Sequence, residues 1–196
     1  MADQPTPLLS PEVRRGAGHY EILGETYAKF EFFENGWNPY TRFLDVDKVD
    51  LILRRRHRNR PRYREVQVKY GKLYPVGSRW ERALFDYTSW RFFREDEFEG
   101  YLDHSDFFIV LILAADIGYQ RDIFIFPVRD FVRFVKCAIP SKGQRKVYIS
   151  RSVHDPAKWY LRRLAKITAL TPDAVEDVSS YRRNFAVLDQ ELTIDK

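Results

Sequence analysis

Four side chains of types that could meet around one divalent metal ion lie in the first half of the sequence. Asp50 opens a short apolar run at 49–53, Gln67 and Lys69 belong to the run at 65–69, and Glu25 precedes both. Branched apolar residues make both runs typical of adjacent β-strands. Because side chains alternate along a strand, Gln67 and Lys69 should point the same way, about 7 Å apart. An acid, an amide oxygen and a lysine would then share one face of a sheet.

The element that should position Glu25 is a helix over residues 18–34. Its apolar residues form two stripes, Tyr20, Leu23, Tyr27 and Phe30 on one side and Ile22, Ala28 and Phe32 on another. Glu25 falls in the second stripe. A carboxylate among apolar neighbours needs a metal, a lysine or water to satisfy it. The alternative is a peripheral glutamate that reaches solvent.

A basic segment separates the two predicted strands. It contains no acid and seven arginines, Arg54, Arg55, Arg56, Arg58, Arg60, Arg62 and Arg64. Asn59 and Pro61 predict a turn, so the segment should form a hairpin tip near the four side chains. Arginine binds phosphate oxygens with paired hydrogen bonds, and the net charge of +5 favours a polyanionic partner. A solvated hairpin without a ligand is the alternative.

Composition excludes several classes of protein. With 196 residues, of which 44% are hydrophobic, the chain should form one well-packed domain. No apolar run is long enough to span a membrane and no secretory signal is apparent, so we expect a soluble, cytoplasmic protein. Cys137 is the sole cysteine, which excludes an internal disulfide and a cysteine-based zinc site and indicates a buried structural thiol. The four histidines are scattered and do not match a zinc-protease spacing.

The remaining elements are predicted from periodicity and turn residues. A helix is expected over 79–98, with Trp80, Leu84, Tyr87 and Trp90 on one packed face. Strands are expected at 38–44, 106–113, 123–128 and 146–150, and a short helix at 130–136. The pairs Asp155-Pro156 and Thr171-Pro172 are typical of helix starts, which predicts two closing helices.

These residues resemble the PD-(D/E)XK nuclease superfamily. The resemblance covers residues 18–130 and is carried by the segment 24–28, Gly36, the Asp50 strand and Gln67-Val68-Lys69. Glutamine in the last motif makes the chain similar to some intron-encoded homing endonucleases, and more loosely to archaeal Holliday-junction resolvases. The resemblance implies an α/β (α+β) fold with a restriction-endonuclease-like core, a mixed central sheet flanked by helices, and extra C-terminal helices. Residues 1–13 would be a disordered tail, 14–138 the core and 139–196 an extension packed on it.

The resemblance also implies an activity, metal-dependent endonucleolytic hydrolysis of duplex or branched DNA. Glu25, Asp50 and Gln67 would hold Mg²⁺ or Mn²⁺, and Lys69 would be the catalytic lysine. Two-strand cutting would suit a homodimer. The chain departs from the family pattern at Gln67, which carries one negative charge fewer than the usual acid and which Glu65 could compensate. Val49 replaces the usual proline before Asp50.

Two other functions fit the same residues. The chain could be a non-catalytic nucleic-acid-binding or assembly module, because fold does not fix function. It could instead be a protein-interaction module, which predicts an exposed face with Trp80 and Trp90. Within the nuclease hypothesis, two nearby carboxylates should raise the pKa of Lys69, so we expect it to orient water or neutralise phosphate charge rather than act as a base.

Overall fold

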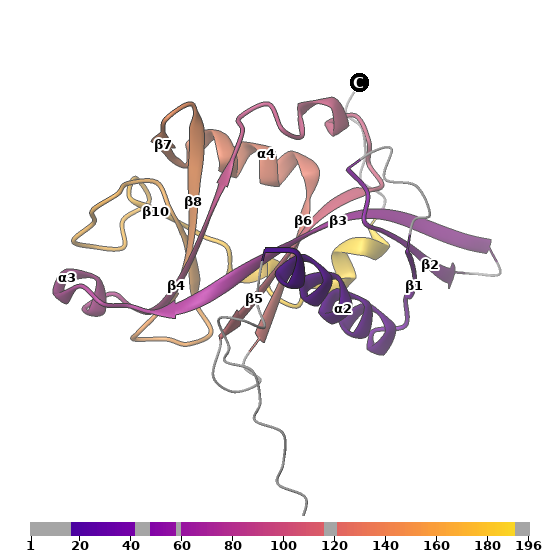
Figure 1. Cartoon of the computed structure of the whole chain (residues 1–196), viewed down its shortest axis with the longest axis horizontal. Helices are drawn as coiled ribbons and strands as arrows, with labels where there is room; N and C mark the ends of the chain where they lie inside the picture. The colour runs from indigo at the N-terminus through magenta and orange to yellow at the C-terminus, as the bar shows by residue number, and fades with distance from the viewer. Residues whose placement is uncertain (1–16, 42–47, 58–59, 116–120, 191–196) are drawn as a thin grey trace, which may run out of the picture.

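A computed structural model describes residues 17–41, 48–57, 60–115 and 121–190, and the structural statements below refer to these residues (Figure 1). The helices are α2 (Ala17–Glu34), α3 (Arg79–Arg82) and α4 (Val128–Cys137), with 3₁₀ turns η1 (Glu99–Tyr101), η2 (Ser179–Tyr181) and η3 (Phe185–Asp189). The strands are β1 (Asn38–Thr41), β2 (Leu51–His57), β3 (Arg60–Pro75), β4 (Phe85–Phe93), β5 (Phe107–Ala115), β6 (Arg121–Pro127), β7 (Ile139–Ser141), β8 (Gln144–Ser152), β9 (Trp159–Arg162) and β10 (Val175–Asp177). The expected mixed α/β fold is confirmed.

Strand β3 joins two sheets and crosses the molecule in Figure 1. In the first sheet the order is β1-β2-β3-β5-β6, and β3 and β5 run parallel while the other neighbours are antiparallel. In the second sheet the end of β3 pairs with β4, which is followed by β8, β9 and β10. Strand β7 pairs with the first residues of β8 in a hairpin. The side chains on the two sides of β3 therefore enter different environments.

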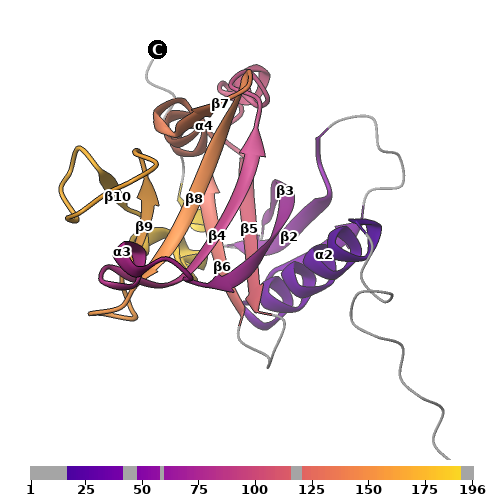
Figure 2. The same cartoon turned by 60° about the vertical axis from the view of Figure 1, so that its left-hand side comes forward.

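Helix α2 covers one side of the first sheet, and Figure 2 shows it alongside β2 and β3. Its buried residues Gly24, Ala28 and Phe32 recur at a spacing of four. Ala28 and Phe32 pack with Val66 and Val68 of β3 in one apolar core, and Gly24 lies against Tyr70. The stripe prediction is wrong for Ile22, which is 67% exposed. The helix ends before Gly36, whose φ of +79° suits glycine at a helix terminus.

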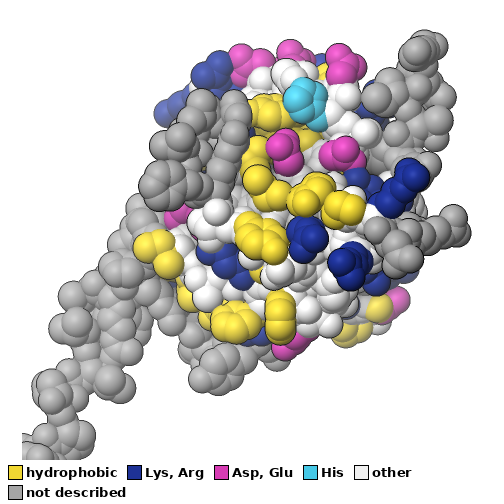
Figure 3. Space-filling view, turned by 90° about the vertical axis from the view of Figure 1, so that its right-hand side faces the viewer, with side chains coloured by type: hydrophobic (Ala, Val, Ile, Leu, Met, Phe, Trp, Pro, Cys, Tyr) yellow, Lys and Arg dark blue, Asp and Glu magenta, His cyan; other side chains and the backbone are white. Residues whose placement is uncertain are grey.

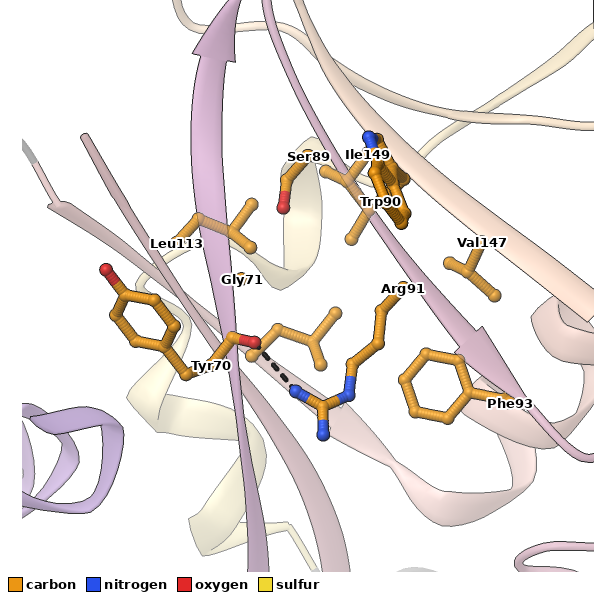
Figure 4. Close-up of a pocket in the computed structure, with 10 residues that line it drawn as sticks. Tyr70, Gly71, Ser89, Trp90, Arg91, Phe93, Leu113, Val147 and Ile149 are labelled. Carbon is orange, nitrogen blue, oxygen red and sulfur yellow. Dashed lines mark hydrogen bonds between the residues drawn. The ribbon is translucent and has the colours of Figure 1, made fainter. Parts of the chain in front are cut away.

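The two sheets diverge at Gly71 of β3. A methyl group on Gly71 would lie 2.6 Å from Oγ of Ser89 and 2.7 Å from Cδ2 of Leu113, so a side chain has no room there. Beside it lies a small pocket, and Figure 4 shows the side chain of Arg91 crossing it; Arg91 donates a hydrogen bond to the carbonyl of Tyr70 at 2.8 Å. The pocket is the wedge left by the separating sheets.

The C-terminal strap, residues 179–190, binds the rest of the chain through ion pairs. The carboxylate of Glu31, which is 4% exposed, accepts two hydrogen bonds from Arg183, at 2.6 and 3.2 Å. The side chain of Arg182 forms an ion pair with Asp122 at 2.6 Å, and its backbone forms an antiparallel β-bridge with Phe124 of β6. The strap therefore attaches to both α2 and β6.

Several element predictions are confirmed and two are wrong. Helices at 17–34 and 128–137 and the strands β2, β3, β5, β6 and β8 lie where the sequence predicted them. The helix expected over 79–98 is instead the short α3 followed by β4, because β4 pairs with β8 along its length. The two closing helices are also wrong, since no α-helix follows α4 among the described residues. Asp155 instead accepts the backbone N–H of Ala157 at 2.9 Å in a turn.

Candidate active site at the edge of β3

Asp50 lies directly before β2, where β2 stops pairing with β3. Its backbone N–H donates to the carbonyl of Val66 at 2.9 Å, which is the last main-chain bond on this side of the pair. Its carboxylate oxygen Oδ2 then accepts the N–H of Val68 at 2.6 Å. The side chain of Asp50 thus takes the place of the next main-chain partner, and its position is fixed by the strand itself.

Gln67 and Lys69 project on the same side of β3, and the sheet brings Gln67 to Asp50. The amide Nε2 of Gln67 donates to Oδ2 of Asp50 at 2.7 Å, and the Gln67 side chain is buried. Val66 and Val68 point to the opposite side and enter the core beneath α2. This is the alternation that the sequence predicted for the strand.

Lys69 lies beside a carboxylate that the sequence analysis missed. Its Nζ is 3.9 Å from Oε1 of Glu97, which follows β4. Burial and the positive charge of Arg91 together lower the pKa of Lys69 more than the charges of Glu97, Asp50 and Glu21 raise it. The expectation that nearby carboxylates would dominate this pKa is therefore wrong. Glu97 was missed because residues 79–98 were predicted as a helix, whereas Glu97 follows the strand β4.

The pKa of Asp50 is shifted in the direction opposite to that of Lys69. Burial raises it, although the hydrogen bonds from Val68 and Gln67 and the charge of Lys69 lower it. Both pKa shifts disfavour the charged form of the side chain, because burial removes the carboxylate of Asp50 and the amine of Lys69 from water. Opposed shifts in two adjacent groups are typical of functional sites.

Two acids on α2 are candidates for the helical member of the site. Glu25, the residue predicted from the sequence, lies 3.9 Å from Lys29, one turn along the same helix. Glu21, one turn earlier, is the helical acid whose negative charge raises the pKa of both Asp50 and Lys69. The two glutamates are four residues apart and so share one face of α2. That spacing could have drawn attention to Glu21.

The oxygen-rich residues of the site suit a hard divalent cation such as Mg²⁺ or Mn²⁺. Among the described residues, no three His, Cys, Asp or Glu side chains form a metal-binding group. A cation beside Asp50 would therefore need the amide oxygen of Gln67 as a ligand. At present Gln67 turns its amide nitrogen toward Asp50, and half a rotation of the amide would present the oxygen.

The predicted arginine hairpin divides into two groups with different partners. Three arginines hold the end of the C-terminal strap. Arg55 pairs with Asp189 at 2.8 Å, Arg62 donates to the carbonyl of Asp189, and Arg64 donates to Leu188 at 2.8 Å. Arg64 is 5% exposed and also pairs with Asp106. The guanidinium of Arg64 therefore has its hydrogen-bond partners inside the protein.

The other side of the hairpin remains accessible. Arg54 and Arg56 alternate with Arg55, so they project on the side that carries Glu65 and Gln67. The hydroxyls of Tyr63 and Tyr40 raise the pKa of Arg54, and these tyrosines are 50% and 45% exposed. Figure 3 shows hydrophobic and basic side chains side by side on the face where β1 and β2 end.

The other predicted hairpin and accessory residues take different positions. Arg60 is exposed on the opposite side of β3 from Arg54, and Arg58 lies outside the described residues. Glu65 borders a polar hollow together with Tyr63 and Asp103. The structure therefore leaves Arg54 and Arg56 as the arginines that share a side with Asp50.

Comparison with solved structures finds a bacterial homing endonuclease, I-Ssp6803I. The two chains superpose with a TM-score of 0.46 and 12% sequence identity, over 89% of this chain and 93% of the other. No protein-family model matches the sequence, and no curated protein matches it either. At this level of similarity, only the residues of the site bear on function.

Other sequence predictions concern parts of the chain away from the site. Cys137 is exposed at the end of α4, so the prediction that it is a buried structural thiol is wrong. None of the helices within the described ranges has the length and apolar character needed to cross a bilayer. Trp90, expected in a packed helix face, is a strand residue that is 43% exposed.

Proposed function

We propose that this chain is a metal-dependent endonuclease that hydrolyses phosphodiester bonds in DNA at the edge of β3. The observation that carries the proposal is the junction of Asp50, Gln67 and Lys69 at the point where β2 leaves β3, with Asp50 bonded to both Gln67 and the backbone of Val68. A carboxylate fixed by backbone is preorganised, so it needs little rearrangement when a charged ligand arrives.

Each residue of the site has a separate role in this proposal. Asp50 and the amide oxygen of Gln67 would hold Mg²⁺ or Mn²⁺, with Glu21 or Glu25 contributing directly or through water. A bound cation supplies positive charge beside the scissile phosphate and lowers the pKa of its water. Lys69, held by Glu97, positions water or neutralises phosphate charge. Arg54 and Arg56 would hold the neighbouring phosphates.

The proposal is tested with purified protein and labelled duplex, branched and single-stranded DNA in Mg²⁺ or Mn²⁺. We expect cleavage by the wild type and a loss of about 100-fold or more in Asp50→Asn and Lys69→Met. Glu34→Gln, which removes an exposed acid at the end of α2, is the control and should cut normally. Folded Asp50→Asn and Lys69→Met proteins that cut as fast as the wild type would show that the chemistry occurs elsewhere.

A non-catalytic nucleic-acid-binding module is the second candidate, and one observation favours it. The hydrogen bond between Gln67 and Asp50 satisfies both groups without a cation. In that function Asp50 would serve only to cap the open edge of β3. Titration with Mn²⁺ separates the two candidates, because a cap has no reason to bind a cation. Binding of DNA with neither cleavage nor Mn²⁺ binding would favour the module.

We also propose that a nuclease of this kind would act as a homodimer on duplex DNA, since each chain carries one such junction. Sedimentation of the protein with and without a duplex tests this. A monomer that cuts both strands of one duplex in a single encounter would contradict it.

A further inference from the structure

The second sheet carries an aromatic platform on the side that faces away from the main core. Its members are Lys72 and Tyr74 of β3, Trp90 and Phe92 of β4, and Lys146 and Tyr148 of β8. Trp90 pairs with Tyr148 and Phe92 with Lys146, while Tyr74 pairs with Thr88 of β4. Residues paired across strands project on one side, so all six share a side. Their strand neighbours Phe93 and Val147 enter the core on the other side.

The large side chains of the platform remain open to solvent. Trp90, Tyr74 and Phe92 are 43%, 40% and 39% exposed, and the rings of Trp90 and Phe92 meet edge to face at 5.8 Å. Helix α2 covers the neighbouring part of this side of the sheet. Near the start of the helix, the ring of Tyr20 stacks on Tyr70 of β3, with 5.2 Å between the ring centres. Adjacent exposed aromatic residues indicate a binding surface, since a monomer rarely leaves them in contact with water.

A cation lies among these rings. Nζ of Lys146 is 4.4 Å from the ring centre of Trp90, 4.7 Å from that of Tyr148 and 5.5 Å from that of Phe92. Lys72 lies over Tyr74 in the same way, at 5.2 Å. Among the described residues, no carboxylate forms an ion pair with Lys146 within 4.0 Å, and none of the six platform residues is acidic. The platform therefore offers ring faces together with positive charge.

We infer that this platform binds single-stranded nucleic acid, with unpaired bases stacked on the rings of Tyr74, Trp90 and Phe92 and phosphates near Lys146. Every base has a flat face that stacks on aromatic rings, and lysines attract the backbone between the bases. An acidic protein partner would use only the positive charge of the platform, and a purely apolar partner would use only its aromatic rings. The platform lies on the opposite side of β3 from Gln67 and Lys69, so the inference is independent of the proposed cleavage.

The tryptophans provide a direct probe of the inference. Of the four tryptophans, Trp37 and Trp159 are buried at 1% and 0% exposure, and Trp80 is half-buried with Arg162 over its ring. Trp90 is 43% exposed, so a base stacked on the platform should quench mainly the fluorescence of Trp90. We expect quenching on titration with a short oligodeoxythymidine in EDTA, which prevents metal-dependent cleavage. Trp90→Phe should abolish most of the quenching, while Phe33→Ala, which removes an exposed ring outside the platform, should leave it unchanged.

Affinity measurements by anisotropy extend this test to the other platform residues. Trp90→Ala and Phe92→Ala should each weaken binding of the oligonucleotide by about five- to 150-fold. Lys146→Gln should reduce the slope of log affinity against log salt by about 0.7. The matched control is Phe33→Ala on α2, which removes an aromatic ring that is 68% exposed outside the platform and should change neither quantity.

Three results would overturn the inference. They are an absence of quenching in folded wild-type protein, equal quenching by a duplex of the same length, and self-association in sedimentation that disappears in Trp90→Ala. The last result would make the platform an interface between copies of the chain. Because the assay contains no metal and does not follow cleavage, failure of the proposed nuclease activity would not affect it.

Discussion

The hydrogen bond between Gln67 and Asp50 makes each side chain depend on the other. Asp50 is partly buried, and burial raises its pKa, so the amide donor and the N–H of Val68 are what keep its carboxylate satisfied. Replacing the amide with an acid would leave two carboxylates in contact. The position of Gln67 therefore links metal binding to stability.

For Gln67→Glu we expect a loss of about 1–3 kcal/mol in the free energy of unfolding at neutral pH without metal. The repulsion raises the carboxyl pKa above its unfolded value near 4.3, so the loss should shrink as pH falls toward about 4. Mn²⁺ should restore stability, because a cation binds two carboxylates better than one. Urea unfolding at both pH values, with and without Mn²⁺, measures this.

The control for that experiment is Gln67→Met, which also removes the amide donor but adds no charge. It should be destabilised without recovery in Mn²⁺. Equal responses of the two variants to Mn²⁺ would contradict a metal at this position.

The two acids of α2 can be ranked by substitution. Glu21→Gln should slow cleavage and weaken Mn²⁺ binding by about tenfold or more, because the charge of Glu21 acts on both Asp50 and Lys69. Glu25→Gln should have a smaller effect, since Glu25 lies beside Lys29. Cleavage rates and Mn²⁺ titrations of both variants measure the difference. A larger effect of Glu25→Gln would return the role to the residue expected from the sequence.

Strand alternation was sufficient to predict part of the site. Gln67 and Lys69 had to share a side, and a short hairpin had to place Asp50 next to that strand. Glu97 could not be predicted, because its approach to Lys69 depends on how β4 turns back across the first sheet. Contacts between residues far apart in sequence leave no local pattern.

At the scale of elements, the main error arose at 85–93. Trp80, Leu84, Tyr87 and Trp90 recur at helical spacing, yet residues 85–93 are rich in aromatic residues, which favour strands. Pairing with β8 decides in favour of the strand. Similarly, Asp155 caps a turn instead of a helix, because capping residues serve both structures. Local sequence was adequate only where burial reinforced it, as in β3 and in β5, which is buried on both sides.

The close approach at Gly71 leads to a prediction about β3. Gly71→Ala should destabilise the protein by about 1–3 kcal/mol, because the added methyl group would meet Ser89 and Leu113. Gly77→Ala is the matched control, since nothing lies within 4 Å of its added carbon, and it should be neutral or slightly stabilising. Thermal or urea unfolding of both variants checks this. Equal stability of the two would mean that the sheets separate easily at this point.

At the scale of the whole molecule, the arginine hairpin joins distant parts of the chain. The sequence predicted a basic hairpin but not that Arg55, Arg62 and Arg64 would hold residues 188–190. Seven like charges in one segment need partners, and the C-terminal strap supplies a carboxylate and several carbonyls. The hairpin is therefore structural on one side and open to ligands on the other.

The two sides of the hairpin predict opposite phenotypes. Arg64→Met should lower the free energy of unfolding by about 2–4 kcal/mol, since buried carbonyls and Asp106 lose their donor. Arg56→Met, at an exposed position, should change stability by less than about 0.5 kcal/mol. It should instead reduce the salt dependence of DNA binding by about one unit of slope. Urea unfolding and binding at several salt concentrations measure both, and the reverse pattern would contradict this division.

The attachment of the strap to the hairpin has a consequence for biosynthesis. Translation makes Arg55, Arg62 and Arg64 more than a hundred residues before Asp189, so the growing chain carries them without their final partners. Their mutual repulsion should keep β2 and β3 from closing firmly until the last segment emerges. We therefore expect β2 and the first half of β3 to become rigid only after residues 188–190 have been synthesised.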